Sequence, residues 1–362
     1  MKIIEIINYF EQIIPLDFQE TYDNCGLQVG NAGQELTKAL ITLDITESVL
    51  EEALEKNCNL IISHHPLIFQ AVKKITGSNP TERILEKALK SDICIYCAHT
   101  SLDNNFNGLN TFIAGKLGLQ QVKILEPAKN VLKKLVVFCP VEHAEKVRNA
   151  LFAAGAGNIG NYDSCSFNTS GAGSFRANEH AKPFVGELNE LHFEPEVRIE
   201  TVFPENIRLQ VIQAMLQSHP YEEVAYDIYP MDNDYANVGS GIIGDLEHEV
   251  AVMDFIGSLK QVFKTGCIRY NKSIRQTVRK VAFCGGSGSF LVKAAMKADA
   301  DILITSDIKY HEFFNENIIL ADIGHFESEN FSTELIASII TKKFPTFAFL
   351  FSQKNTNPVH YF

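Results

Sequence analysis

The chain has 362 residues, of which 46% are hydrophobic and 21% are charged, proportions typical of a globular protein with two or three cores and not of a disordered or fibrous one. Its net charge of -12 argues against a dedicated nucleic-acid binder, because such proteins usually carry a basic surface. Polar residues interrupt the apolar stretch 1–14, so we expect an amphipathic helix there, no signal peptide or membrane span, and a cytoplasmic protein. The eight cysteines lie mostly in apolar runs, which predicts buried thiols in a reducing compartment.

Strands alternate with helices in the first third of the chain. The stretch 15–30 breaks the helical pattern and ends in an apolar segment between glycines, which predicts a turn and an edge strand. Further strands are predicted at 39–44, 59–65 and 93–98, with helices at 46–56 and 81–90; Thr46 is the expected N-cap of the first helix. This alternation predicts a mostly parallel sheet flanked by helices.

The first third of the chain has a second copy near the other end. Residues 38–65 align without gaps with residues 280–307, and both segments have the pattern strand, turn, helix, buried strand, polar tip. Residues 93–103 correspond in the same way to residues 319–329. Each ends in a histidine followed by a carboxylate four positions later, His99 with Asp103 and His325 with Glu329. Two copies of one unit, each with such a pair at a strand end, predict a two-metal site between the halves, near a pseudo-twofold axis.

Two adjacent histidines, His64 and His65, follow the buried strand 59–63 where its carboxyl end should reach the surface. Ligands gather at such strand ends in open α/β sheets, and histidine is the commonest metal ligand. Adjacent side chains of an extended segment face opposite ways, so the pair requires either a kink, for which Pro66 is well placed, or two different binding partners. The alternative interpretation is a polar loop with two solvated histidines.

The pattern changes between residues 127 and 232. Segments 133–140, 143–156, 164–167, 192–204, 206–220 and 224–230 are predicted as strand, helix, strand, strand, helix and strand, the order of a ferredoxin-like split βαβ fold. Its glycine-rich part, 154–175, lacks the P-loop lysine and is interpreted as a mobile loop in preference to an anion-binding loop. The predicted fold class is therefore α/β, with two related halves, 1–126 and 233–362, with mostly parallel sheets around a dinuclear metal site, and an inserted α+β domain at 127–232.

The second half supplies further candidate residues beside the predicted site. A helix is expected at 249–264. Gly285, Gly286, Ser287 and Gly288 join a strand to a helix, where free backbone amides could bind a phosphate, although a tight turn without a ligand explains them equally well. His311 is a candidate proton shuttle, and the polar tail with Asn355 and Asn357 is expected to cover the site.

Five motifs occur in a fixed order: YDNCGLQVG at 22–30, IISHHP at 61–66, AHTSLD at 98–103, TSD with YHE at 305–312, and GHFESE at 324–329. Together they resemble the Nif-three-like dinuclear metal-centre family, also known as GTP cyclohydrolase I type two homologues, over about residues 23–358. The insert resembles the CutA/PII-like domain of the family's long members. Tyr22 departs from the pattern, since we expect the family to favour tryptophan there.

The resemblance implies which residues bind metal and how the subunits assemble. The implied metal ligands are His64, His65, Asp103, His325 and Glu329. The implied assembly is a homo-oligomer, a toroidal hexamer whose metal sites face an internal cavity. Three imidazoles and two carboxylates cannot saturate two cations, so one carboxylate is expected to bridge them and open positions to hold water. Nitrogen and oxygen ligands suit two divalent ions per chain, Zn, Mn, Fe or Co, and do not choose among them.

These residues predict a dinuclear metal-dependent hydrolase acting on a nucleotide-like small molecule. For GTP, metal-bound hydroxide would open the guanine imidazole ring, His99 or His311 would move protons, and the turn 285–288 would hold phosphate. His99 has the position in the first half that His325 has in the second, and it is assigned either to orienting the site or to proton transfer. A two-metal hydrolase of phosphate esters or cyclic amides would present the same ligands. The alternative is a metal-binding regulatory or scaffold protein whose insert senses a ligand or partner.

Overall fold

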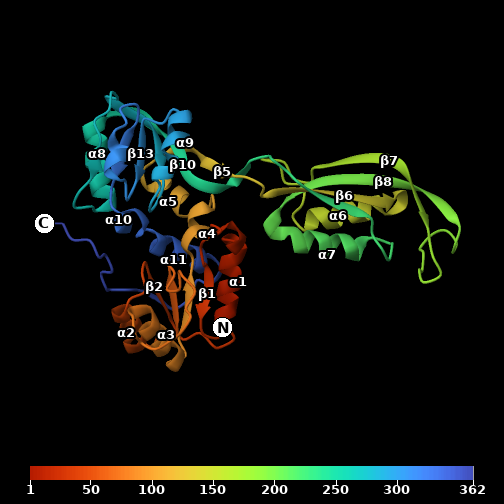
Figure 1. Ribbon diagram of the computed structural model, residues 1–362, viewed down its shortest axis with the longest axis horizontal. Coiled ribbons are helices and arrows are strands. Elements are labelled where there is room, and N and C mark those ends of the chain that lie inside the picture. The colour runs from red at the N-terminus through yellow and green to blue at the C-terminus, as the bar shows by residue number, and fades with distance from the viewer. Residues whose placement is uncertain (362) are drawn as a thin grey trace. The chain divides into compact units, whose positions relative to one another are not determined.

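The computed structural model describes residues 1–361, and in it the chain divides into two compact units (Figure 1). Unit 1 combines Met1–Pro127 with the chain from Asn237 onward, and unit 2 is Ala128–Ala236. Among the described residues, no helix has the length and apolar character needed to cross a membrane. Unit 1 holds both copies of the sequence repeat.

The first sheet of unit 1 has the strand order β1-β4-β3-β2-β15. Its central strands β2, β3 and β4 are parallel to one another, β15 runs parallel beside β2, and β1 is an antiparallel edge strand beside β4. The strands are β1 (Gly26–Val29), β2 (Ala39–Thr42), β3 (Leu60–Ser63), β4 (Cys94–Cys97) and β15 (Phe349–Phe351). The helices that precede, connect or follow them are α1 (Ile3–Ile13), η1 (Leu16–Phe18), α2 (Glu47–Glu55), α3 (Pro80–Lys90), α4 (His99–Asn104), α5 (Leu109–Lys116) and α11 (Ser332–Lys343).

The second sheet of unit 1 repeats this arrangement with the order β11-β14-β13-β12-β10-β5. Strands β12, β13 and β14 are parallel, and β11 is an antiparallel edge strand beside β14, as β1 is beside β4. The strands are β5 (Gln120–Ala128), β10 (Tyr235–Ala251), β11 (Arg269–Tyr270), β12 (Thr277–Phe283), β13 (Ile302–Thr305) and β14 (Ile319–Asp322). The helices are α8 (Val252–Phe263), η4 (Ser289–Leu291), α9 (Val292–Lys297), η5 (Tyr310–Phe313) and α10 (His325–Glu329). The predicted repeat is therefore confirmed in the three parallel strands at the centre of each sheet. The first sheet is mostly parallel, but the second is mixed, because β10 also runs antiparallel beside β12.

Local sequence explains where these elements begin and end. The Thr46 hydroxyl accepts a hydrogen bond from the Val49 amide at the start of α2, so Thr46 is the predicted N-cap. Helix α8 begins three residues after the predicted residue 249, because Val250 and Ala251 still pair with β12. Every residue of β2, β3, β4, β13 and β14 is buried, as expected for parallel strands covered on both faces.

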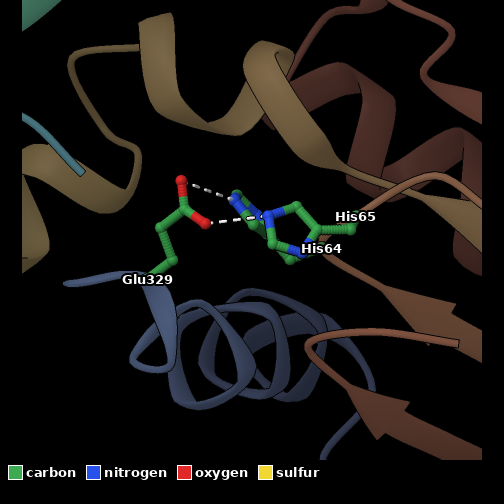
Figure 2. Close-up of side chains that lie close together, drawn as sticks. All are labelled: His64, His65 and Glu329. Carbon is green, nitrogen blue, oxygen red and sulfur yellow. Dashed lines mark hydrogen bonds and ion pairs between the residues drawn. The ribbon is translucent and has the colours of Figure 1, made fainter. Parts of the chain in front are cut away.

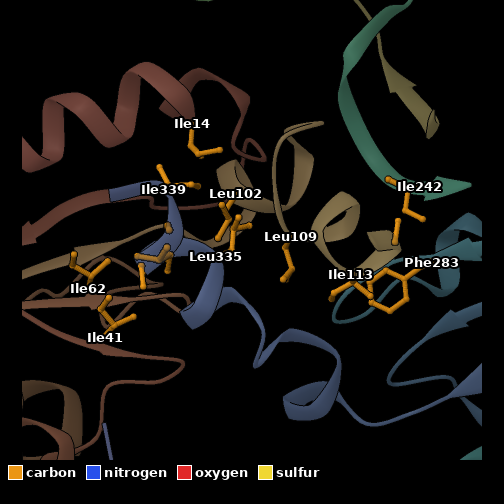
Figure 3. Packing of buried hydrophobic residues seen from close by; sticks show 14 of the residues in the cluster. Ile14, Ile41, Ile62, Leu102, Leu109, Ile113, Ile242, Phe283, Leu335 and Ile339 are labelled. Carbon is orange, nitrogen blue, oxygen red and sulfur yellow. The ribbon is translucent and has the colours of Figure 1, made fainter. Parts of the chain in front are cut away.

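One hydrophobic cluster extends across both sheets of unit 1 (Figure 3). Ile41 and Ile62 contribute to it from the first sheet, and Phe283 contributes from the second. Between them lie residues of α5 and α11, such as Ile113 and Leu335. Because this shared core joins the two halves, the carboxyl ends of β3, β4 and β14 are held in one compact body, where their polar tips can meet.

Unit 2 is a four-stranded antiparallel sheet with the order β7-β8-β6-β9, the arrangement of a ferredoxin-like fold. The apolar face of the sheet packs against two helices through a core that includes Val137, Ile199, Val147 and Met215. The elements are β6 (Leu132–Pro140), η2 (Val141–His143), α6 (Ala144–Ala153), β7 (Ser166–Arg176), β8 (Leu191–Pro204), η3 (Glu205–Ile207), α7 (Arg208–Ser218) and β9 (Tyr226–Pro230).

The glycine-rich segment of unit 2 corrects one prediction. Apart from a short strand predicted at 164–167, residues 154–175 were expected to form a mobile loop, but Ser166–Arg176 form strand β7, which pairs with β8 over its whole length. Glycine is poor in strands because it offers no side chain to pack. At Gly173 the missing side chain leaves room for the carboxylate of Glu196, because a Cβ there would lie 2.1 Å from its Oε2.

Candidate metal centre

Two histidines of the candidate metal centre, His64 and His65, directly follow the last residue of strand β3. The amides of His64 and His65 donate hydrogen bonds to the carbonyls of Thr42 and Leu43, so the backbone continues alongside β2 beyond the last residue of the strand. Both imidazoles nevertheless turn toward the same carboxylate, that of Glu329 (Figure 2). Their ring centroids are 5.0 Å apart, with the ring planes inclined at 53°.

Glu329 lies between three imidazoles. Its Oε2 is 2.8 Å from Nε2 of His65 and 3.0 Å from Nε2 of His325, and its Oε1 is 3.7 Å from Nε2 of His64. His325 and Glu329 are the first and last residues of α10, and their spacing of four puts them on one face of the helix. Asp103 reaches the cluster from α4, with Oδ1 at 3.7 Å from Nε2 of His64. The five residues implied by the family resemblance therefore lie together.

Each of the three less deeply buried imidazoles is held by an aspartate on its Nδ1 atom. Asp44 is 2.7 Å from His65, Asp307 is 2.6 Å from His325, and Asp23 is 2.8 Å from His99. A carboxylate on Nδ1 fixes the tautomer and the ring orientation, and it makes Nε2 the nitrogen presented to a metal. His99 is therefore held in the same tautomer as His65 and His325, and its ring centroid is 5.4 Å from that of His65.

Burial and charge shift the pKa values of all five residues implied by the family resemblance. Burial lowers the pKa of His64, which favours the neutral imidazole that binds metals. Burial also opposes a charge on His65, but the hydrogen bonds of His65 to Asp44 and Glu329 outweigh it and raise the pKa to about 10. In His325 the contacts with Glu329 and Asp307 outweigh burial in the same way and raise the pKa to about 9. A metal ion entering at neutral pH would therefore displace protons from these two histidines.

The pKa values of the two carboxylates, Asp103 and Glu329, are shifted in opposite directions. Burial, followed by the negative charge of Glu329, raises the pKa of Asp103 far above its usual value. Burial has the same tendency at Glu329, but contacts with His325, His64 and His65 outweigh it and hold the pKa of Glu329 well below the usual range. Two carboxylates this close to one another are costly unless positive charge is supplied.

The chemistry of the cluster fits divalent metal ions. His64 is fully buried, yet neither of its ring nitrogens has a hydrogen-bond partner among the described residues, and the same holds for Oδ1 of Asp103. Buried polar atoms without partners are rare and costly, and a metal ion would satisfy them. Ligand atoms of His64, His65 and Glu329 all lie within 4.8 Å of one another. This set of nitrogen and oxygen donors suits Zn, Mn, Fe or Co.

A cavity of about 360 Å³ opens beside the centre within unit 1. Its wall includes His65 and His325, together with Arg269, Asn357 and Tyr361. The C-terminal tail thus lines a cavity that reaches two of the candidate ligands. Of the two asparagines expected to cover the site, Asn357 lines this cavity and Asn355 is not among its lining residues. Among neighbouring tail residues, Thr356 donates a hydrogen bond to Asp44, the aspartate that holds His65.

The structure does not support the predicted roles of His311 as a proton shuttle and of the turn 285–288 as a phosphate site. His311 is exposed, its ring lies against Phe314 and Tyr310, and no hydrogen bond joins it to the cluster within residues 1–361. The amides of Gly285, Gly286 and Gly288 already donate to side-chain oxygens of Asn110, Ser328 and Thr305, so these three amides are not free to receive a phosphate.

The glycine turn instead makes room for the candidate ligands. Gly286 has a φ of 60°, and a Cβ there would lie 2.3 Å from Oε1 of Glu329. The hydroxyl of Ser287 donates to Asp307, the aspartate that holds His325. The turn therefore leaves space for Glu329 and holds Asp307, and these two contacts explain its sequence without a bound anion.

The three supporting aspartates were not among the residues predicted from the sequence. Asp23, Asp44 and Asp307 stand in loops, with no regular spacing to the histidines that they hold. One signal was present, because Asp307 is the counterpart of His65 in the repeat and therefore belongs at a strand end of the site. Asp23 also lies in the first of the five quoted motifs.

The fold and the cluster together define a class, namely α/β proteins that carry a histidine and carboxylate cluster able to hold metal where the strand ends of two related sheets meet. The family described as Duf34/NIF3 (NGG1p interacting factor 3) matches residues 1–358. This chain belongs to that family.

Individual relatives agree with this assignment. A Bacillus subtilis (strain 168) protein named GTP cyclohydrolase 1 type 2 homolog is 40% identical over 362 residues, which cover 98% of this chain and 97% of the relative. A Staphylococcus epidermidis protein of the same name is 32% identical over 371 residues and all of both chains. The crystal structure of a Bacillus cereus protein related to NIF3 has a TM-score of 0.85 and 37% identity, covering 100% of this chain and 99% of the other.

Proposed function

We propose that the chain is a dinuclear metal-dependent hydrolase, with two divalent ions per chain held by His64, His65, Asp103, His325 and Glu329. The observation that carries the proposal is the position of Glu329, whose two oxygens face different imidazoles. A carboxylate with its oxygens directed to separate groups of ligands suits the bridge of a two-metal site. The fully buried atoms of His64 and Asp103 that have no partner in the described part of the chain support the same conclusion.

Divalent ions bound here would supply Lewis-acid chemistry and would acidify a coordinated water. The protein's own residues would position a substrate and move protons. Asp23 holds Nδ1 of His99, so Nε2 is the atom at which His99 would accept and return a proton. The side chain of His99 is 17% exposed, and its Nε2 has no hydrogen-bond partner among the described residues, so it is available for this role.

The substrate we propose is a guanine nucleotide, whose imidazole ring would be opened by hydrolysis as in GTP cyclohydrolases. Support comes from the name shared by several relatives, GTP cyclohydrolase 1 type 2 homolog. The cavity lined by His65, His325 and Arg269 is large enough for part of a small molecule to reach the candidate ligands. We further propose that the chain assembles into a ring-shaped hexamer, which light scattering would test.

A second candidate is a regulatory or scaffold protein in which the metal stabilises the fold. The burial of two candidate ligands favours this second function. His64 is 0% exposed and Glu329 is 3% exposed, as is common in closed structural metal sites. The two candidates differ in one respect. A structural site would bind metal without turning over any nucleotide.

The test follows the loss of GTP by chromatography, using protein loaded with Mn or Zn. We expect His99→Gln to lower turnover by about 100-fold or more, since positioned proton transfer contributes about 10²–10⁴-fold. The matched control is His311→Gln, which changes an exposed histidine that makes no hydrogen bond to the cluster and should stay within about twofold of the wild type. Equal losses in both variants would contradict the role given to His99. Metal binding without turnover of GTP would favour the regulatory protein.

A further inference from the structure

Unit 2 contains a cavity of about 570 Å³ that plays no part in the metal centre. Its wall is formed mainly by strands β7 and β8, the segment 177–184 and the turn 221–225, with Phe138 of β6. This volume is within the range of about 300–1,000 Å³ that is usual for small-molecule sites. All of the lining residues belong to unit 2.

Aromatic rings form one side of the cavity. The centroid of the Tyr221 ring is 6.2 Å from that of Phe175 and 6.2 Å from that of Phe184, with the ring planes inclined at 60° and 48°. Phe138 also contributes to the wall. Aromatic faces that meet at a corner attract an apolar body, and they attract a cation more strongly than an anion.

A buried carboxylate lies beside these rings. Glu196 is 9% exposed, and its Oε1 accepts a hydrogen bond of 3.0 Å from the Tyr221 hydroxyl. Burial, followed by the hydrogen bond to Glu196, raises the pKa of Tyr221, so the phenol keeps its proton and acts as the donor. Oε2 of Glu196 has no hydrogen-bond partner among residues 1–361, and no basic side chain of the described chain pairs with this carboxylate.

The strand opposite is built to accommodate this carboxylate. Residue 173 is glycine, and a Cβ at that position would lie 2.1 Å from Oε2 of Glu196 and 2.6 Å from Cδ. The carboxylate therefore occupies space that any larger residue would fill. A largely buried carboxylate without a positive partner favours a cation in the cavity beside it.

The other charges of the cavity also favour a positive ligand. Glu222 and Glu223 line it, and the basic lining residue Arg198 is already paired with Glu200 at 3.0 Å. The aromatic corner and the carboxylate are adjacent, so one small molecule can meet both.

We propose that unit 2 binds a small organic cation, an ammonium compound with an aromatic or apolar body. Its charged group lies at Oε2 of Glu196, and its body lies against the rings of Phe175, Phe184 and Tyr221. The proposal concerns unit 2 alone and does not depend on hydrolase activity at the metal centre.

Three matched probes test the proposal by calorimetry or ligand-observed NMR on the full chain, in a buffer without amines. They are tyramine, its neutral counterpart 4-ethylphenol, and its acidic counterpart 3-(4-hydroxyphenyl)propionate. We expect tyramine to bind at least tenfold more tightly than either of the others. Glu196→Gln should remove that preference, because it removes the charge and keeps the shape. Glu145→Gln, on the exposed side of α6, is the control and should leave the preference intact.

Circular dichroism of each variant establishes that unit 2 remains folded. Tyr221→Phe provides a second check, since it keeps the ring and removes only the hydroxyl, so the preference for tyramine should persist. Equal binding of the three probes, preferential binding of the acid, or no binding of any probe would overturn the proposal. Self-association of the chain in sedimentation that Phe184→Ala weakens would indicate that a second copy covers the cavity, and it would overturn the proposal as well.

Discussion

Asp307→Asn tests whether the aspartates on Nδ1 prepare the histidines for metal. The carboxylate of Asp307 lies 2.6 Å from Nδ1 of His325 and also accepts a hydrogen bond from Ser287. Asparagine has the same shape and tolerates the left-handed backbone conformation at this position, where φ is 55°. It cannot supply the negative charge that makes His325 a strong ligand. We expect metal affinity to fall by about 10–100-fold, which corresponds to about 1.4–2.7 kcal/mol.

The assay is a competition titration against a chromophoric zinc chelator at neutral pH, on metal-free protein. The chain offers a close control in Asp299→Asn, because Asp299 has nearly the same backbone conformation, with φ at 57°, and pairs with Arg275 far from the cluster. The control should bind zinc as tightly as the wild type. An unchanged affinity in Asp307→Asn, or an equal loss in both variants, would refute the claim that this aspartate orients a metal ligand.

Three other predictions concern stability. Removing metal with a chelator should lower the melting temperature, and restoring metal at about 100 times its Kd should return about 2.7 kcal/mol of stability. Glu52→Gln should lower the melting temperature at about pH 7, because buried Glu52 accepts hydrogen bonds from Lys56 and from Ser352 of the C-terminal strand region. Gly286→Ala should destabilise the protein and weaken metal binding, because its Cβ would lie 2.3 Å from Oε1 of Glu329.

The effect at Glu52 has a defined dependence on pH. Although burial opposes the charge, hydrogen bonds to Lys56, Ser352 and Gln353 lower the pKa of Glu52 in the folded chain. Its contribution is therefore fully present above the unfolded value of about 4.3 and is lost as the pH falls through the folded value. The melting temperatures of the wild type and Glu52→Gln should converge toward acidic pH. A constant difference would contradict this account, and exposed Glu55→Gln provides the control.

The tests of Gly286→Ala and of metal removal also have defined controls and contrary outcomes. Gly257→Ala lies within α8 and would meet no atom within 4 Å, so it should be neutral or slightly stabilising where Gly286→Ala is harmful. If both alanine variants melt alike, the clearance argument for Gly286 fails. A melting temperature that is insensitive to chelation and to added metal would count against a metal ion bound to the folded state.

The fold could be predicted from the sequence to the extent that hydrophobic periodicity and the repeat specified it. Fully buried strands such as Leu60–Ser63 and Ile302–Thr305 are recognisable because their first three residues are all apolar. The error at Ser166–Arg176 has a physical cause, since glycines normally weaken strands. Gly173 is tolerated there because Glu196 fills the space above it, and this cross-strand contact leaves no local signal in the sequence.

The candidate site was predictable where chain geometry alone brings residues together. Strand ends of a parallel sheet share one edge, so His64 and Asp103 could be expected near one another, and a spacing of four on a helix brings His325 to Glu329. The aspartates on Nδ1 could not be predicted in this way, because loop conformation decides which carboxylate reaches which imidazole. For the same reason the position of His311, in the short helix η5, did not follow from its nearness in sequence to Asp307.

The number of metal ions per chain tests the central claim most directly. Protein is loaded with Mn or Zn, desalted and measured by elemental analysis, in parallel with Glu329→Gln. We predict two equivalents in the wild type and fewer than one in the variant, since Glu329 is the carboxylate that contacts all three candidate imidazole ligands. Fewer than one equivalent in the wild type, or two equivalents in both proteins, would contradict a dinuclear centre built around Glu329.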